Sequence, residues 1–159
     1  MKNNLWYSQN DHIPVLGHRG ICAKFPENTL VSFEAAIRLG VDLIEFDVNI
    51  TRNCVPVVIH DNDIGRTSDH EGLTREYTLA ELKSFDFGGY FDEKFKGTNI
   101  PTLEEVLYNT ENHPLCCREP SPVLSQAAVP NYQLLIKQAV FLPGSRLPII
   151  CINRKEMWS

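Results

Sequence analysis

Two carboxylates, Glu45 and Asp47, stand two residues apart in the mostly apolar segment from Val41 to Val48. In a β-strand, side chains two positions apart point to the same face, so this spacing places both carboxylates side by side. Their charges repel unless something positive compensates, and a hard divalent cation with oxygen ligands would do so. A solvent-facing polar edge is the alternative, but a parallel sheet covered by helices leaves little such edge. The pair is therefore a candidate metal or catalytic site.

Two histidines each follow an apolar run: His18 comes after residues 15–17, and His60 comes after residues 57–59. Active sites of α/β proteins form at the carboxyl ends of parallel strands. Two imidazoles beside a metal could divide general base and general acid roles in phosphoryl or acyl transfer. Arg19 adds a bidentate donor suited to a phosphate oxygen, although a surface salt bridge explains an arginine there equally well.

The elements that must position these residues follow from the spacing of apolar side chains. Residues Ile13–Gly17 and Val41–Val48 have strand patterns, and a helix is predicted between them at Thr29–Leu39. A third apolar run, Val55–Ile59, has the length of another strand. Strand, helix and strand at this spacing predict an α/β fold with parallel strands.

After the second histidine the sequence predicts short elements separated by polar or aromatic loops. In chain order these are a loop at Asn62–Gly72, a helix from Thr78 to about Phe85, an aromatic loop at Asp86–Thr98, a helix from Thr102 to about Asn109, a short helix at Tyr132–Leu142 and a strand at Leu147–Ile152.

Composition excludes several classes of protein. The chain has 159 residues, 43% hydrophobic and 22% charged, which is typical of a globular protein. A formal net charge of −5 argues against a protein whose main function is to bind nucleic acid. No apolar run approaches the roughly 18 residues of a membrane span, and residues 1–14 lack the apolar segment of a secretory signal. Five scattered cysteines favour a reducing compartment, so we expect a cytoplasmic protein.

The composition changes after Tyr108. Residues 1–108 hold 17 acidic and 10 basic side chains, a net charge of −7, whereas residues 109–159 hold 3 acidic and 5 basic ones, a net charge of +2. We therefore predict two parts, residues 13–108 and a compositionally different tail at residues 109–159.

An ordered series of motifs between about Ile13 and Leu107 resembles the glycerophosphodiester phosphodiesterases. The motifs are His18-Arg19-Gly20, Pro26-Glu27-Asn28-Thr29, Ile44-Glu45-Phe46-Asp47-Val48, Pro56-Val57-Val58-Ile59-His60-Asp61, Arg66-Thr67 and Ile100-Pro101-Thr102-Leu103-Glu104-Glu105. Each is weak alone, but together and in this order they are specific.

The resemblance implies a TIM-barrel (β/α)8 fold with its site at the carboxyl ends of the strands. It implies hydrolysis of a glycerophosphodiester, a small-molecule substrate, to glycerol 3-phosphate and an alcohol. Residues 61–100 resemble the insertion that members of the family place above the barrel mouth. A phosphoinositide-specific phospholipase or a phospholipase D-like toxin on a similar barrel is the alternative enzyme, but the Pro-Glu-Asn-Thr run favours the glycerophosphodiester enzymes.

The resemblance also assigns roles to individual residues. Glu45 and Asp47 would bind a divalent cation, Mg²⁺ or Ca²⁺. His18 and His60 would be the general acid and base, and Arg19 would hold the phosphate. Glu27, in the Pro-Glu-Asn-Thr run, would support the site rather than bind the metal.

The resemblance stops near Leu107. Members of the family continue to a strand of the form Ile-Glu-x-Lys, whereas the only comparable segment here, Ile152-Asn153-Arg154-Lys155, carries Asn153 in place of the glutamate. A complete barrel needs about 250 residues, so we expect an incomplete barrel whose open edge favours self-association. Catalysis by this chain would then be impaired or absent. The alternative is an inactive fragment whose tail comes from a shifted reading frame or an alternative exon.

Overall fold

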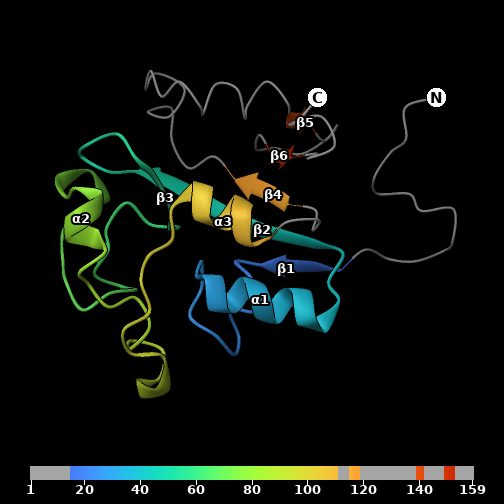
Figure 1. Ribbon diagram of the computed structural model, residues 1–159, viewed down its shortest axis with the longest axis horizontal. Coiled ribbons are helices and arrows are strands. Elements are labelled where there is room, and N and C mark those ends of the chain that lie inside the picture. Colours follow the sequence, from blue (N-terminus) through green and yellow to red (C-terminus); the bar gives the residue numbers. More distant parts are fainter. Residues whose placement is uncertain (1–14, 111–114, 119–138, 142–148, 153–159) are drawn as a thin grey trace, which may run out of the picture.

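The computed structural model describes residues 15–110 together with the backbone of three strands at residues 115–118, 139–141 and 149–152. The elements in chain order (Figure 1) are β1 Leu16–His18, α1 Leu30–Leu39, β2 Leu43–Ile50, β3 Pro56–Val58, the 3₁₀ helix η1 Thr74–Glu76, α2 Leu79–Leu82, the 3₁₀ helix η2 Glu93–Phe95, α3 Leu103–Asn109, β4 Leu115–Arg118, β5 Ala139–Phe141 and β6 Ile149–Ile152.

These strands form a mixed sheet in the order β1-β2-β4-β6-β5. Strands β1, β2 and β4 are parallel, whereas β6 is antiparallel to β4 and β5 is antiparallel to β6. The expected α/β architecture is therefore present in part. Among the described residues the sheet is open and mixed rather than an all-parallel barrel.

The predicted β-α-β unit is confirmed by the parallel pairing of β1 and β2, but the third predicted strand is not parallel to them. Strand β3 pairs antiparallel with β2, with Val48 opposite Val58. Residues 51–55 alone connect the two strands, and so short a connection closes a hairpin, whereas a parallel crossover needs a dozen residues or more. The turn is closed by hydrogen bonds from the Val55 N–H to Thr51 Oγ1 and from the Thr51 N–H to the Val55 carbonyl.

The long helix of the first unit is confirmed, with ends set by local chemistry. Thr29 is extended and its hydroxyl oxygen accepts from the Ser32 N–H, which caps the start of α1. Gly40 has φ 74° at the end of the helix, a left-handed conformation that favours glycine. Two further caps are confirmed at Thr78 and Thr102, although α2 ends at Leu82, before the expected boundary.

Beyond α3 the sequence predictions fared less well. The short helix expected at Tyr132–Leu142 is wrong for Ala139–Phe141, which form strand β5, and residues 132–138 and 142 lie outside the described residues. Apolar runs this short cannot be assigned to helix or strand by periodicity, and here pairing with β6 decides. The strand expected at Leu147–Ile152 is confirmed for Ile149–Ile152, which form β6, and residues 147–148 lie outside the described residues; β4 had no predicted counterpart.

Strand β2 lies in the middle of the core. Residues Leu43 to Asn49 are all buried, and α1 and α3 pack on the cluster that contains Ile44, Phe46 and Val48. A second cluster joins β3 to residues between 64 and 100. Because Glu45 is 7% exposed and Asp47 is 1% exposed, the solvent-facing polar edge considered for this pair is ruled out.

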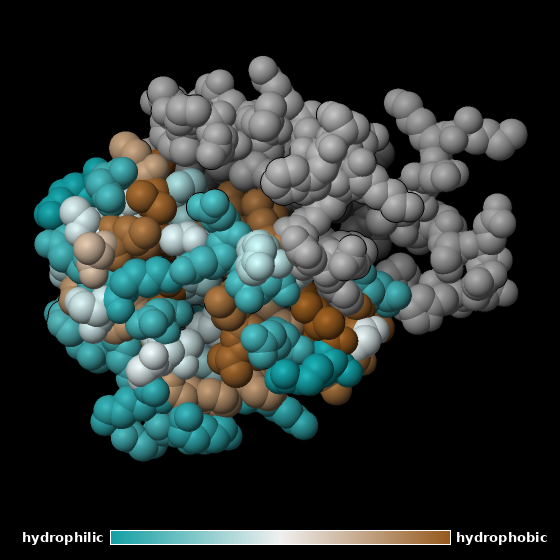
Figure 2. Space-filling view, viewed as in Figure 1, coloured by the Kyte–Doolittle hydropathy of each residue, from teal (hydrophilic) through white to brown (hydrophobic). Residues whose placement is uncertain are grey.

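Exposed apolar side chains remain on the surface. Figure 2 shows apolar patches between hydrophilic side chains on one face, including the region of β1 and α1. The large exposed apolar residues of the described part include Val15, Leu16 and Leu39. No helix in the described residues is both long and apolar enough to cross a membrane.

Candidate active site

The turn after β1 presents His18 and Arg19 at the end of the parallel pair β1-β2. Arg19 has φ 51° and Gly20 has φ 81°, two successive left-handed residues that reverse the chain sharply. The side chain of Ser32 on α1 fixes this turn, since its hydroxyl donates to the Arg19 carbonyl and accepts from the Ile21 N–H. The start of α1 therefore holds the backbone that carries both candidate residues.

Glu45 lies directly beside His18, as the register of β1 and β2 requires. Its Oε2 accepts from the Arg19 N–H at 3.2 Å and lies 3.9 Å from His18 Nε2. The His18 ring is half exposed, and its Nδ1 lies 3.9 Å from Cys22 Sγ. Glu45 and His18 thus meet at an accessible edge of an otherwise buried cluster.

Asp47 is the most deeply buried member of the site. Its Oδ2 accepts from Asn28 Nδ2 at 3.2 Å and lies 3.3 Å from Arg19 Nε, within ion-pair distance but not aligned for a hydrogen bond. Its Oδ1 is buried with no hydrogen-bond partner. An orphaned carboxylate oxygen beside a second carboxylate suits an oxygen-preferring cation, so the residues fit the predicted metal. Residues 15–110 contain no group of three or more potential ligands.

The β2-β3 hairpin brings His60 to the cluster that contains Glu45 and Asp47. The antiparallel return carries the chain back along β2, where the Ile59 N–H donates to the Asp47 carbonyl at 3.0 Å. The side-chain amide of Asn49 then donates to the carbonyls of Ile59, His60 and Asp61, which fixes the backbone around the histidine. His60 Nδ1 lies 2.6 Å from Asp61 Oδ1.

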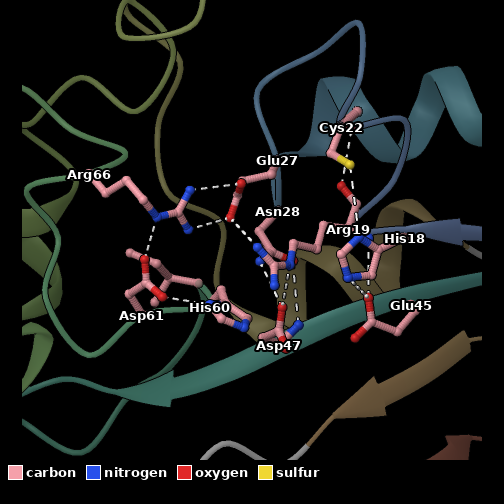
Figure 3. A network of polar contacts seen from close by, with 12 residues as sticks. His18, Arg19, Cys22, Glu27, Asn28, Glu45, Asp47, His60, Asp61 and Arg66 are labelled. Atoms are coloured by element: carbon pink, nitrogen blue, oxygen red, sulfur yellow. Dashed lines mark hydrogen bonds and ion pairs between the residues drawn. The ribbon is translucent and has the colours of Figure 1, made fainter.

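A chain of alternating charges joins these parts (Figure 3). Arg66 donates through both terminal nitrogens to Glu27, at 2.7 and 3.0 Å, and through Nε to Asp61 at 2.5 Å. Glu27 also accepts from Arg19 Nη1 at 2.9 Å. The order of charges is therefore Asp61, Arg66, Glu27, Arg19 and Asp47, and it runs from the His60 side of the site to the buried carboxylate.

The charge chain changes the acidity of its members. Burial alone would raise the pKa of Glu27, but hydrogen bonds and attraction from Arg66 and Arg19 hold that pKa below its usual value. Burial acts on the pKa of Asp61 in the same direction, and hydrogen bonds from Arg66 and His60 lower it. The hydrogen bond to Glu27 is the main cause that raises the pKa of Arg66. Both carboxylates are thus held ionised at neutral pH.

The structure brings all five predicted site residues into one cluster. His18, Arg19, Glu45 and Asp47 are connected as described above, and the hairpin adds His60. The Arg19 side chain is only 14% exposed and pairs with Glu27 and Asp47, so the salt bridges that it forms are largely buried rather than on the surface.

Sequence analysis assigned no role in the candidate site to four residues that contact it: Asn28, Asn49, Asp61 and Arg66. Asn28 stands in the Pro-Glu-Asn-Thr run with no role assigned to it, but it has φ 56° and its side-chain amide donates to Asp47. Asp61 follows His60 directly, and a carboxylate next to a candidate catalytic histidine is a signal that could have been used. Nothing in the spacing of Asn49 or Arg66 predicts their partners, because those contacts depend on the hairpin and on the path of the insertion.

A family model described as the glycerophosphoryl diester phosphodiesterase family matches residues 18–137, which is most of the chain and includes the whole cluster. The chain belongs to this family. The glycerophosphodiester phosphodiesterase of Caldanaerobacter subterraneus is 48% identical over 93 residues, which are 58% of this chain and 38% of the relative. Glycerophosphodiester phosphodiesterase 1 of Homo sapiens is 32% identical over 107 residues, 66% of this chain and 32% of the human protein.

Solved structures of the phosphodiesterase family agree. A phosphodiesterase of Oleispira antarctica, solved with the product sn-glycerol-3-phosphate, matches with a TM-score of 0.72 and 32% identity over 79% of this chain and 52% of that one. The glycerophosphodiester phosphodiesterase of Agrobacterium tumefaciens matches with a TM-score of 0.66 and 30% identity over 77% of this chain and 54% of that one.

This phosphodiesterase chain spans well under half the length of the curated relatives named above. Membership of the family and the likeness to these structures imply a TIM-barrel fold, of which the described residues form an incomplete, mixed sheet with few helices.

Proposed function

We propose that this cluster hydrolyses glycerophosphodiesters to glycerol 3-phosphate and an alcohol. The observation that carries the proposal is a pair of histidines in one cluster with two buried carboxylates: His18 lies beside Glu45, the Ile59 N–H next to His60 bonds to the Asp47 carbonyl, and Asp47 Oδ1 has no hydrogen-bond partner. A phosphodiester needs charge neutralisation, an activated nucleophile and a protonated leaving group, and these side chains can supply all three. The product bound by the Oleispira antarctica relative supports a substrate of this class.

His18 and His60 act in this proposal as the general acid and base. His60 Nδ1 faces the Asp61 carboxylate, which can only accept, so Nδ1 carries a proton and Nε2 is the nitrogen available for proton transfer. The His18 ring is half exposed beside Glu45, and it can exchange a proton with a substrate that approaches from solvent. Arg19 stabilises the phosphate from between the two carboxylates that fix its position.

Glu45 and Asp47 would hold a divalent cation, Mg²⁺ or Ca²⁺, in the proposed enzyme. When bound, the cation supplies charge neutralisation at the phosphate. In the complete fold, a (β/α)8 barrel, the insertion at residues 61–100 would lie above the mouth of this site, and Tyr90 would help to hold it there, since its hydroxyl oxygen accepts from the Glu27 N–H.

Hydrolysis of glycerophosphocholine in the presence of Mg²⁺ or Ca²⁺ tests the proposal. We expect slow turnover that falls by at least about 100-fold in His18→Ala and in His60→Ala, because each removes a proton-transfer group. His70→Ala, which alters an exposed histidine paired with Asp69 outside the cluster, is the matched control and retains the parent rate.

The second candidate is the inactive fragment. It is favoured by the fact that the described residues offer two acidic ligands and no third. Turnover by the parent chain that does not exceed that of the double variant His18→Ala, His60→Ala at any concentration of either cation would contradict the proposed function and support this candidate.

A further inference from the structure

Arg66 lies outside every motif role assigned above, yet it has two ionic partners in the site, as many as Arg19. It contacts Glu27 through two nitrogens and Asp61 through a third. Such a planar fork can satisfy two carboxylates at once, which a lysine ammonium does less well. The side chain thus ties the start of the insertion to the Pro-Glu-Asn-Thr turn.

The position of the His60 backbone does not depend on Arg66. Asn49 donates to the carbonyls on both sides of the histidine and to its own, and the Ile59 N–H is bonded to β2. What these contacts leave undetermined is the rotation of the imidazole and the choice of the nitrogen that carries the proton. Asp61 alone bonds to the ring among the described residues, and Arg66 holds Asp61.

We propose that Arg66 is a positioning residue for His60, since it aims the Asp61 carboxylate at Nδ1 and so fixes the imidazole tautomer and the direction of Nε2. The role in catalysis rests on the proposed function, but the effect on the tautomer does not. Through Glu27 the same guanidinium also braces Arg19, so one side chain connects the proton-transfer group to the phosphate-binding group.

The ionisation of the partners is consistent with this arrangement. Hydrogen bonds from Arg66 lower the pKa of both Asp61 and Glu27 against the opposing effect of burial. Without Arg66, two carboxylates would remain at the edge of the site with fewer cations, and Asp61 would be free to rotate toward solvent. His60 would then adopt the mixture of tautomers found in an unrestrained imidazole.

Nitrogen NMR of the histidine ring tests the proposal on the full ¹⁵N-labelled chain at about pH 8, where a histidine of ordinary pKa is neutral. We expect a proton on Nδ1 of His60 in the parent and a shift toward Nε2 protonation in Arg66→Met. Arg66→Lys also shifts toward Nε2 protonation, because one ammonium does not replace the fork. Asp61→Ala, which removes the acceptor of the Nδ1 proton, shows the same shift and provides a second variant if Arg66→Met fails to fold.

Arg52→Met is the matched control, since Arg52 is an exposed arginine that pairs with Glu81 far from the histidines. It leaves the His60 signals unchanged. Parent-like Nδ1 protonation in folded Arg66→Met, or an equal shift in Arg52→Met, would overturn the positioning role. If the parent hydrolyses glycerophosphocholine, Arg66→Met lowers kcat about 10-fold or more with little change in KM. Absence of turnover in the parent would contradict the proposed function and leave the NMR result to decide the role of Arg66.

Discussion

At the scale of a single residue, Asp47 is the buried carboxylate on which the candidate metal site depends. Its two oxygens have different surroundings: Oδ2 is engaged by Asn28 and Arg19, whereas Oδ1 is buried with no partner. A buried polar atom without a partner costs free energy in the folded state. A cation bound at that oxygen would therefore stabilise the fold as well as assist the reaction.

Asp47→Asn should remove that stabilisation. At a cation concentration 100-fold above Kd, binding adds about 2.7 kcal/mol to the free energy of unfolding, so Mg²⁺ or Ca²⁺ should raise the Tm of the parent by several degrees and leave that of Asp47→Asn unchanged. Differential scanning calorimetry measures both. Asp92→Asn alters an exposed aspartate paired with Lys94 and retains the parent response. An equal rise of Tm in Asp47→Asn would show that the cation binds elsewhere.

Glu27 should make the fold sensitive to acid. Its pKa is lower in the folded state than in the unfolded chain, where it is near the ordinary value. The contribution of this carboxylate is therefore fully present above the unfolded pKa and is lost as the pH falls through the folded one. Urea unfolding from about pH 7 to about pH 3 should show a smaller acid-induced loss of stability in Glu27→Gln than in the parent.

The control for acid sensitivity is Glu34→Gln, which removes one carboxylate from the exposed face of α1. It should retain the acid-induced loss of the parent. An unaltered pH dependence in Glu27→Gln would mean that other carboxylates carry the effect.

At the scale of elements, sequence reasoning succeeded where the signal was local. The start of α1 at Thr29 and its end at Gly40 depend on caps within one turn of the helix, and both were predicted. The direction of β3 was not, because period-two alternation says which face a side chain occupies but not which way the next strand runs. The length of the connection, five residues, decides the direction of β3.

Gly20 packs closely against the start of α1 and has a left-handed backbone conformation. It has φ 81°, and a Cβ there would lie 2.7 Å from the carbonyl carbon of Ser32 on α1. Gly20→Ala should destabilise the fold by about 3 kcal/mol, since it adds a backbone clash to the cost of a left-handed alanine. Gly40→Ala measures the cost of the left-handed conformation without the clash. Gly40 has φ 74° but nothing lies within 4 Å of its Cβ position, so the expected loss of stability is about 1 kcal/mol. Equal losses in urea unfolding would show that the contact with Ser32 relaxes.

At the scale of the whole molecule, the predicted open barrel edge remains a prediction. Among the described residues β1 pairs with β2 alone; Val15 just before it and Leu16 on it are 53% and 38% exposed. Unpaired strand edges with apolar side chains favour pairing with another chain. We therefore expect concentration-dependent self-association that Leu16→Lys suppresses in sedimentation velocity.

Tyr108→Lys is the matched substitution for self-association, because Tyr108 is 74% exposed on α3 and away from the sheet edge. It should leave the association unchanged. Parent-like association of Leu16→Lys would exclude this edge as the contact.

The candidate site was more predictable than the sheet that carries it. The five residues singled out from spacing converge because each lies at a strand end or on one strand face, which sequence patterns report. The ion pairs of Arg66 and the strand order beyond α3 depend on contacts between distant segments. No local sequence pattern encodes those contacts. The change of composition at Tyr108 does not mark the end of the family match, which continues to residue 137.

The β2-β3 hairpin has a consequence for the order in which this protein takes shape during synthesis. Every contact of the charge chain joins residues between 18 and 66. Because the hairpin folds His60 back onto β2, none of these contacts requires a residue from the strands beyond α3. A nascent chain that has left the ribosome as far as Arg66 already contains every member of the charge chain, so the site can begin to assemble while the rest of the sheet is still being translated.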